Sequence, residues 1–399
     1  MTWKPELILH VGAPKCGSSA LQRALSLTPD LVDGTGRKLR YSGWQQAGRL
    51  ARPVYGKTVT EMATTSPYGY VSWPNMPETD QDAAVFGGLS ATRLAGVRQG
   101  FVPIASCEGW ITRHALFARQ LALWGHPPVE VVAFLRPVVD WTNSAFWQWG
   151  VWHVPTLDLW LERSRMTYTF GTDLEAWSKI PNVRVRFAWS RPDAVAQFAR
   201  WQGVTLPSES SLNSSSPPAL LGVLLRNRDL RPTAHGAATE FVVQRWCPPV
   251  PGRKAWSVLA RHIRALRPTA AENLEALSRV ATDPAEKAMC EDPRWLREKP
   301  YHALILAGIS PLNDRAQLAA LHSSLAEGLG RLAETLGVPV PEIPPCPAAD
   351  AELAEWDRVL VSMLRAVLDG DARVRKAAEG TGARLRSKVS GVTRRLLGG

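Results

Sequence analysis

The chain has 399 residues and a net charge of +11 at pH 7. Hydrophobic residues make up 45% of it, which is enough for a sizeable globular core. Its length fits two or three domains, or one large α/β domain with extensions. No run of about 18 apolar residues occurs, which excludes a membrane-spanning helix, and the short apolar run at the N-terminus is not expected to be a signal peptide. The five cysteines are scattered without CxxC spacing, which argues against a disulfide framework or a zinc site and predicts reduced thiols in a cytoplasmic protein.

Short apolar strands alternate with helical patterns through the first half of the chain. The predicted strands are ELILHVG (6–12), FVPIASCE (101–108), VEVVAFLR (129–136) and VRVRFAW (183–189). The helical patterns that follow them cover residues 18–27, 111–125, 137–150 and 192–203. This alternation predicts a parallel sheet with helices on both faces, a three-layer α/β fold. Residues 206–218 are a loop by composition, and the chain beyond them is largely helical, with no internal repeat.

The loop between the first strand and its helix is rich in glycine. Gly12 and Gly17 bracket it, Lys15 lies inside it, and Ser18 and Ser19 close it. A strand that ends in such a turn and leads into a helix aims backbone N–H groups and the helix dipole at one point, where a phosphate binds. The loop lacks the GK[ST] ending of a nucleotide P-loop, and no Asp-ended strand for Mg²⁺ is evident, so it favours a phosphate-type group bound without metal. The alternative is a turn that merely packs the helix on the strand.

A second motif follows the third predicted strand. Arg136 ends this strand, and Ser144 lies eight residues later in the next helix, where the pair can bind a second phosphate beside the first. Together the two motifs resemble the PAPS-dependent sulfotransferases, whose loop binds the 5′-phosphosulfate and whose Arg–Ser pair binds the 3′-phosphate. ILHVGAPKCGSSALQ is most similar to the bacterial carbohydrate-type branch, and the resemblance covers roughly residues 6–230.

The resemblance implies a cytoplasmic, metal-independent enzyme that moves a sulfuryl group from PAPS to a hydroxyl of a small molecule or glycan, most plausibly a sugar or glycolipid. The donor-binding residues that it implies are Lys15, Cys16, Gly17, Ser18, Ser19, Arg136, Ser144 and Trp189, the last as a partner of adenine. Cys16 departs from the usual Thr or Ser. Because it lies between a lysine and a helix N-terminus, we expect the most reactive thiol of the chain there, unless its side chain turns into the core.

Sulfuryl transfer needs a base for the acceptor hydroxyl. Glu108 ends the strand before the one that carries Arg136, where the family places its base, so it is the candidate, with an N-cap or ion-pair role as the alternative. Lys15 would then stabilise charge on the bridging oxygen. His114 and His153 are second choices, and His10 is expected in the core. The Trp cluster of residues 141–152 is expected to be core, with sugar stacking as the alternative.

The positive charge is concentrated at the C-terminus. Residues 373–399 hold eight Lys or Arg and one Glu, so the rest of the chain is nearly balanced and no specific nucleic-acid binding is expected. An amphipathic helix is predicted over 353–367, and beyond Gly370 the apolar residues Leu385, Val389, Val392 and Leu396 form one stripe. The tail is either a peripheral contact to the inner face of an anionic membrane or a solvated extension.

The predicted domains are a sulfotransferase α/β domain over 1–335, with its motifs in 6–230, and a helical extension over 336–399 with the basic tail. Two other functions stay open at this point. One is a P-loop kinase or NTPase, which would need Mg²⁺ and ATP. The other is a non-catalytic nucleotide-binding member of the same fold.

Overall fold

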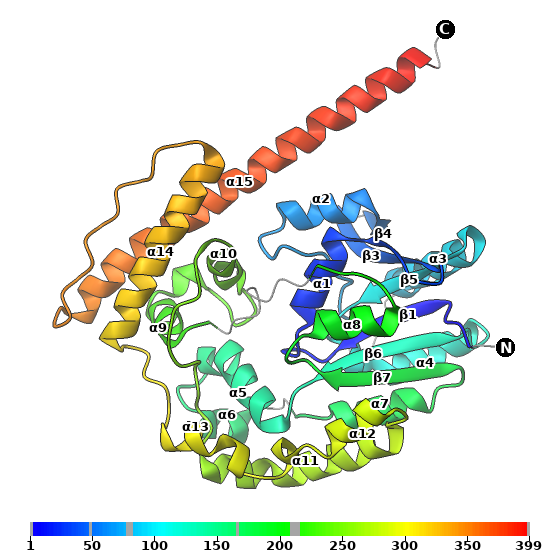
Figure 1. Cartoon of the computed structure of the whole chain (residues 1–399), viewed down its shortest axis with the longest axis horizontal. Coiled ribbons are helices and arrows are strands. Elements are labelled where there is room, and N and C mark those ends of the chain that lie inside the picture. The colour runs from blue at the N-terminus through cyan, green and yellow to red at the C-terminus, as the bar shows by residue number, and fades with distance from the viewer. Residues whose placement is uncertain (1–2, 48–49, 77–82, 165–166, 208–215, 397–399) are drawn as a thin grey trace. The chain divides into compact units, whose positions relative to one another are not determined.

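The computed structural model describes residues 3–47, 50–76, 83–164, 167–207 and 216–396, with side chains up to residue 379 (Figure 1). The chain forms two compact units. The first consists of Met1–Thr60, Tyr70–Asn213 and Trp256–Ile309, and the second of Glu61–Gly69, Ser214–Ala255 and Ser310–Gly399. The predicted domain boundary at residue 335 does not coincide with these units and stays a prediction.

The first unit is mixed α/β and contains a mostly parallel sheet. Among the described residues the sheet has seven strands in the order β2-β3-β5-β1-β6-β7, and β4 pairs with β3. The strands are β1 Leu7–Gly12, β2 Asp30–Val32, β3 Lys38–Ala47, β4 Leu50–Tyr55, β5 Phe101–Ser106, β6 Val129–Leu135 and β7 Val183–Trp189. The predicted parallel sheet is confirmed for β5, β1, β6 and β7. The additional strand β3 is parallel to β5, and β2 and β4 are antiparallel to β3.

The central strands have the composition of a sheet covered on both faces. Every residue of β1 and of β6 is buried, and both segments are almost continuously apolar. Helices α1 and α8 contact each other (Figure 1), and α3, α7 and α12 contact strands of the sheet. The longer helices of this unit are α1 Ser18–Leu27, α3 Ala83–Gln99, α4 His114–Leu123, α5 Val138–Gln148, α6 Leu157–Arg163, α7 Phe170–Ser178, α8 Ala194–Gln202, α11 Ala260–Val280, α12 Pro284–Cys290 and α13 His302–Leu306.

Short 3₁₀ helices complete the first unit, at η1 Trp110–Arg113, η2 Gly150–Trp152, η5 Pro293–Trp295 and η6 Lys299–Tyr301. Helix α2, Lys57–Thr65, continues from residues of the first unit into residues of the second. β2, β3, β4, α2, α3, α6 and α7 were not predicted from the sequence.

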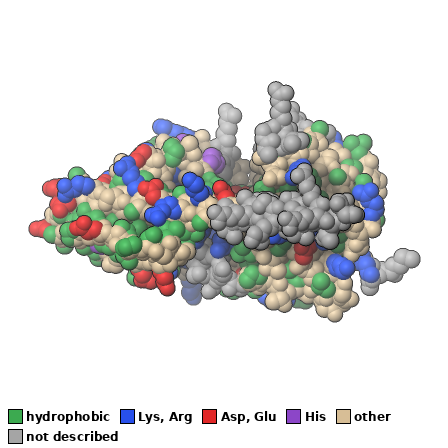
Figure 2. Space-filling view, turned by 90° about the horizontal axis from the view of Figure 1, so that it is seen from above, with side chains coloured by type: hydrophobic (Ala, Val, Ile, Leu, Met, Phe, Trp, Pro, Cys, Tyr) green, Lys and Arg blue, Asp and Glu red, His purple; other side chains and the backbone are tan. Residues whose placement is uncertain are grey.

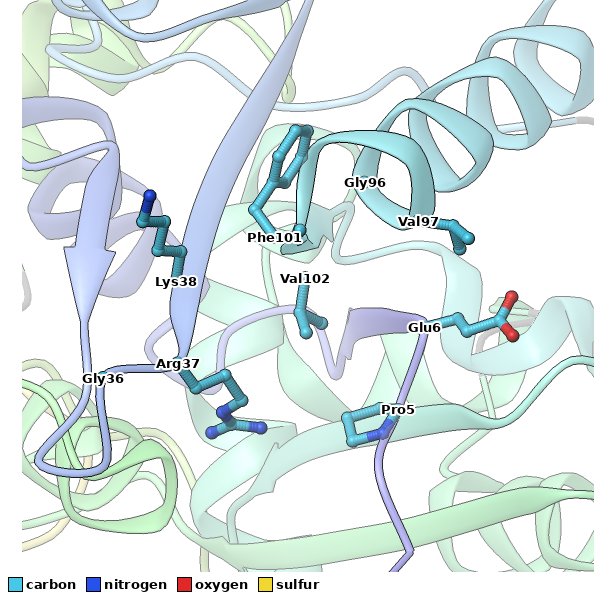
Figure 3. Close-up of a pocket in the computed structure, with 10 residues that line it drawn as sticks. Pro5, Glu6, Gly36, Arg37, Lys38, Gly96, Val97, Phe101 and Val102 are labelled. Atoms are coloured by element: carbon cyan, nitrogen blue, oxygen red, sulfur yellow. The ribbon is translucent and has the colours of Figure 1, made fainter.

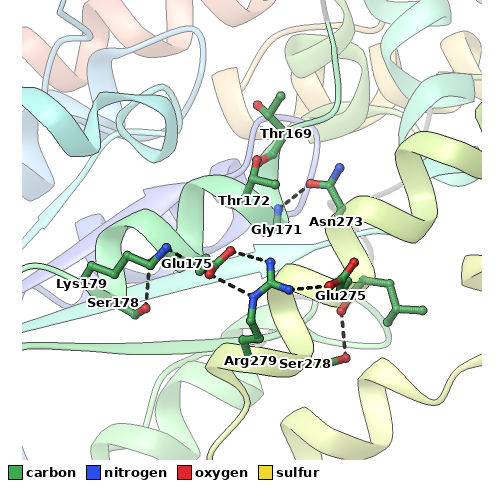
Figure 4. A network of polar contacts seen from close by, with 11 residues as sticks. Thr169, Gly171, Thr172, Glu175, Ser178, Lys179, Asn273, Glu275, Ser278 and Arg279 are labelled. Atoms are coloured by element: carbon green, nitrogen blue, oxygen red, sulfur yellow. Dashed lines mark hydrogen bonds and ion pairs between the residues drawn. The ribbon is translucent and has the colours of Figure 1, made fainter.

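Helices α7 and α11 pack closely through a polar network (Figure 4). A Cβ at Gly171 would lie 2.2 Å from the Asn273 carbonyl oxygen, so only glycine allows this approach. The Asn273 side chain accepts a hydrogen bond from the Gly171 N–H at 2.7 Å, and Glu175 pairs with Lys179 and Arg279 at 3.0 and 2.9 Å. These contacts attach residues 256–309 to the sheet-bearing part of the unit.

The second unit is helical in its described residues. Its helices are α9 Pro218–Arg226, η4 Arg228–Leu230, α10 Ala238–Trp246, α14 Arg315–Leu336 and α15 Leu353–Leu396. The largely helical C-terminal part that the sequence predicts is therefore observed.

The expected end of the C-terminal helix near residue 367 is wrong, because α15 continues through Gly370. A Cβ at Gly370 would lie 2.9 Å from a Leu332 methyl group, so the glycine lets α15 approach α14. The next residue, Asp371, is fully buried and accepts hydrogen bonds from Arg245 and the Trp246 indole at 2.7 and 2.8 Å. Helix formation continues because these contacts stabilise the turn beyond the glycine.

Two further observations concern hydropathy and surface charge. In the part of the chain that the structure describes, no helix is long and apolar enough to cross a lipid bilayer. Figure 2 shows Lys and Arg side chains interspersed with Asp and Glu on the displayed face.

Candidate active site

The predicted site residues follow neighbouring strands at one edge of the sheet. β1 lies between β5 and β6, with His10 opposite Ser106 in the parallel register. The backbone continues this pairing beyond the strands, because the Ala13 N–H donates to the Phe134 carbonyl at 3.0 Å and the Ser190 N–H to the Leu135 carbonyl at 2.9 Å. The segments that follow β5, β1, β6 and β7 therefore meet at the carboxyl edge, where open α/β sheets bind ligands.

The loop after β1 has an unusual backbone. Gly12, Lys15 and Gly17 have φ values of +116°, +62° and +89°, in the region that favours glycine. A Cβ at Gly12 would lie 2.3 Å from the Glu108 carbonyl oxygen, so glycine is required for Glu108 to lie against the loop. The buried Ser18 hydroxyl donates to the Ala13 carbonyl at 3.3 Å, which closes the loop on itself.

Helix α1 begins at Ser18, directly after this loop, and its first turn holds no acidic residue. Its N-terminal dipole is therefore not offset by a carboxylate of that turn. Ser19 is half-buried in the same turn. The predicted loop residues thus come together at one helix N-terminus.

Arg136 and Ser144 are brought together as the sequence predicts. The Arg136 guanidinium donates to the Ser144 hydroxyl at 3.1 Å and to the Ser190 hydroxyl at 3.4 Å. Burial lowers the pKa of this guanidinium, and the nearby charge of Arg191 lowers it further. An arginine that is held by hydroxyls in a desolvated position, with a second arginine close by, has the chemistry of an anion-binding group.

Glu108 is an exposed residue, and its backbone carbonyl lies against Gly12 of the loop. Desolvation raises the pKa of its carboxyl above the ordinary value, while the Lys15 ammonium lowers it. Neither η1 nor α4, the two helices that follow Glu108, has a side-chain N-cap hydrogen bond. The pKa of the carboxyl is therefore subject to two opposed effects, of which desolvation is the larger.

The expectation of a reactive Cys16 thiolate is wrong. The Cys16 side chain is fully buried, and burial raises the pKa of its thiol to about 12, against the smaller opposing effects of Arg136 and Lys15. Desolvation therefore has a larger effect on the pKa of this thiol than the neighbouring cations. The side chain turns into the core, and the residue presents its backbone to the loop.

A segment far along the chain adds groups that the sequence analysis missed. The Arg294 guanidinium lies 5.1 Å from the centre of the Trp189 ring, and the Trp295 ring lies 5.2 Å from Trp189. The Tyr301 hydroxyl donates to Asp140 at 2.9 Å. Trp189 is thus part of an aromatic and cationic cluster made by β7 and residues 293–301. No motif points to this segment, because it has neither a strand-to-helix junction nor a glycine turn.

Of the three histidines considered in the sequence analysis, His10 and His114 have partners within the fold, and His153 is exposed. His10 is buried, its Nδ1 lies 2.7 Å from the Ser106 hydroxyl, and desolvation lowers its pKa to about 3. His114 pairs with Asp173 at 3.4 Å, and His153 is exposed. In the predicted Trp cluster, Trp141, Trp147 and Trp152 are buried, which confirms the core interpretation for these three, and Trp149 is half-buried.

A separate, open pocket of about 270 Å³ lies at the opposite edge of the sheet (Figure 3). Its lining comes from the amino-terminal ends of β1, β3 and β5 and includes Glu6, Lys38 and Phe101. It contains none of the predicted site residues. Among the described side chains, no group of three or more His, Cys, Asp or Glu could hold a metal ion.

Comparisons of the chain with protein-family models, with curated proteins and with solved structures found no match.

Proposed function

We propose that this chain is a PAPS-dependent sulfotransferase with a three-layer α/β domain and a P-loop-like phosphate site. The observation that carries the proposal is the contact between Arg136 and Ser144 at the carboxyl edge, beside the loop that holds Lys15. Two anion-binding groups on adjacent strands suit a donor with two separate phosphates. Trp189, with Arg294 over its ring, supplies an aromatic surface for the adenine.

In this proposal the loop residues 13–19 and the N-terminus of α1 would hold the 5′-phosphosulfate, and Arg136 and Ser144 the 3′-phosphate. Glu108 takes the proton of the acceptor hydroxyl while the acceptor oxygen forms a bond to sulfur. The bond between sulfur and the bridging oxygen breaks, and adenosine 3′,5′-bisphosphate leaves. Lys15 stabilises the charge that develops on the bridging oxygen.

The raised pKa of Glu108 supports its assignment as the base, because a more basic carboxylate accepts the hydroxyl proton more readily. Only the resemblance to the family supports the proposal that the acceptor is a hydroxyl of a sugar or glycolipid. The proposal also includes a cytoplasmic location, which the scattered cysteines favour, and a contact of the basic tail with an anionic membrane surface, which its charge and apolar stripe favour.

Calorimetry tests the donor assignment. We expect adenosine 3′,5′-bisphosphate to bind without Mg²⁺, and ATP to bind more weakly whether or not Mg²⁺ is present. Preference for ATP with Mg²⁺ would favour the kinase or NTPase alternative. Binding of the bisphosphate without turnover on any sugar or glycolipid acceptor would favour the non-catalytic alternative.

A further inference from the structure

Helix α5 directs one face toward the loop after β1. Trp141, Ser144 and Gln148 are spaced i, i+3 and i+7, so they share this face. The Trp141 indole N–H donates to the Pro14 carbonyl at 3.1 Å. The Gln148 side-chain oxygen accepts a hydrogen bond from the Lys15 ammonium at 2.9 Å. A single helix face therefore contacts both the backbone and the lysine of the loop, in addition to the arginine that Ser144 contacts.

Lys15 needs this support for two reasons. Its φ of +62° is unfavourable for a residue with a Cβ and persists only where the surroundings determine it. Its ammonium also ends a flexible four-carbon chain, so without acceptors it samples many positions. The Trp141 contact restrains the backbone next to Lys15, and the Gln148 contact restrains the ammonium.

We propose that Gln148 is a positioning residue that aims the Lys15 ammonium at the bridging oxygen of the sulfuryl donor; this inference rests on the function proposed above. A glutamine suits the task because its amide oxygen accepts a hydrogen bond without neutralising the lysine. A carboxylate at the same place would pair with the ammonium and repel an anionic donor. Ser144 thus accepts a hydrogen bond from Arg136, and Gln148, one turn later, accepts one from Lys15.

The variants Gln148→Ala and Gln148→Glu test the inference, with Gln99→Ala as the control. Gln99 also ends a helix, α3, but it is exposed and precedes the amino-terminal end of β5. We expect Gln148→Ala to lower kcat by ~10–150-fold, the range for a hydrogen bond to a charged group. Its affinity for adenosine 3′,5′-bisphosphate should change less than about threefold, because Arg136 and Ser144 remain.

Gln148→Glu should instead weaken binding of the bisphosphate by ~10-fold or more, because it adds a negative charge beside Lys15. Equal kcat in Gln148→Ala and the wild type would overturn the inference. So would parallel losses of kcat and bisphosphate affinity in Gln148→Ala, because a merely structural role would produce them.

A second readout does not depend on activity. In protein labelled with ¹³C and ¹⁵N on lysine, the Lys15 ammonium should give an NMR signal that is absent from Lys15→Arg. We expect Gln148→Ala to lose this signal to exchange with water, and Gln99→Ala to retain it. An unchanged signal in Gln148→Ala would overturn the positioning role. Loss of the signal in a protein that binds neither nucleotide would support the contact while refuting the proposed function.

Discussion

Removal of the Arg136 guanidinium should weaken binding of adenosine 3′,5′-bisphosphate by ~10–150-fold. This magnitude follows from the loss of one charge-assisted hydrogen bond, worth about 1.5–3 kcal/mol, at 1.4 kcal/mol per tenfold. Ser144→Ala removes a neutral hydroxyl and should cost about 0.5–1.5 kcal/mol, or ~2–12-fold. Because the hydroxyl accepts from Arg136 at 3.1 Å, part of its contribution passes through the arginine.

Calorimetry on Arg136→Ala, Ser144→Ala and the double variant measures this coupling. We expect the double variant to lose less affinity than the product of the single losses, as residues in direct contact do. Arg136→Lys should lie between the wild type and Arg136→Ala, since lysine keeps the charge but not the planar donor geometry. Arg119→Ala, at an exposed position of α4, serves as the control. Wild-type affinity in a folded Arg136→Ala, judged by its Tm, would refute the assignment of this pair to the 3′-phosphate.

The remaining predictions concern the base, the thiols and the tail. Glu108→Gln should lower turnover by ~10²–10⁴ and should raise Tm at pH 8 but not at pH 4. Because the pKa of Glu108 is raised in the folded protein, the free energy of unfolding falls as pH rises from the ordinary carboxyl pKa to the folded pKa. Glutamine does not ionise and so removes this loss. A lower Tm of Glu108→Gln than of the wild type at pH 8 would contradict the expected sign. In an alkylation experiment followed by peptide mass mapping, the exposed Cys346 should be labelled first and the buried Cys16 only after unfolding. Rapid labelling of Cys16 in the native protein would show that its side chain faces the ligand. Truncation after Gly380 keeps the buried Asp371 but removes five Lys or Arg residues. The truncated protein should therefore keep the wild-type Tm but sediment less with anionic liposomes at low salt. Equal sedimentation of both forms would exclude the tail as the membrane contact.

The parallel strands of the sheet were predictable because their sequences are short apolar runs between turn signals. Residues 183–189 and 18–27 form the predicted strand and helix with unchanged bounds. The edge strands β2 and β4 were missed because β2 has only three residues and β4 contains Pro53, which is unfavourable for a central strand. Their pairing with β3 depends on tertiary contacts rather than on local pattern.

The candidate site was predictable where it follows the ends of parallel strands, which topology places at one edge. Glu108, Arg136 and the loop around Lys15 belong to this group. Gln148 was missed because its role depends on the helical face that it shares with Ser144, and a glutamine at a helix end carries no signal of its own. The burial of Cys16 was missed because local electrostatics predicts a thiolate, while desolvation depends on packing.

The discontinuity of the first unit bears on how the protein is completed during synthesis. Asp140 receives its hydrogen bond from Tyr301, about 160 residues later in the chain. A ribosome that adds 5–20 residues per second needs roughly 8–30 s to cover that interval. Once residue 189 has been added, the loop, α5 and the parallel strands of the sheet have all been made, while the Trp189 ring and the Asp140 carboxyl still have no partner from residues 293–301. The carboxyl edge of the nascent sheet therefore lacks the contacts of residues 293–301 for seconds, and a translational pause between residues 213 and 256 would lengthen that interval.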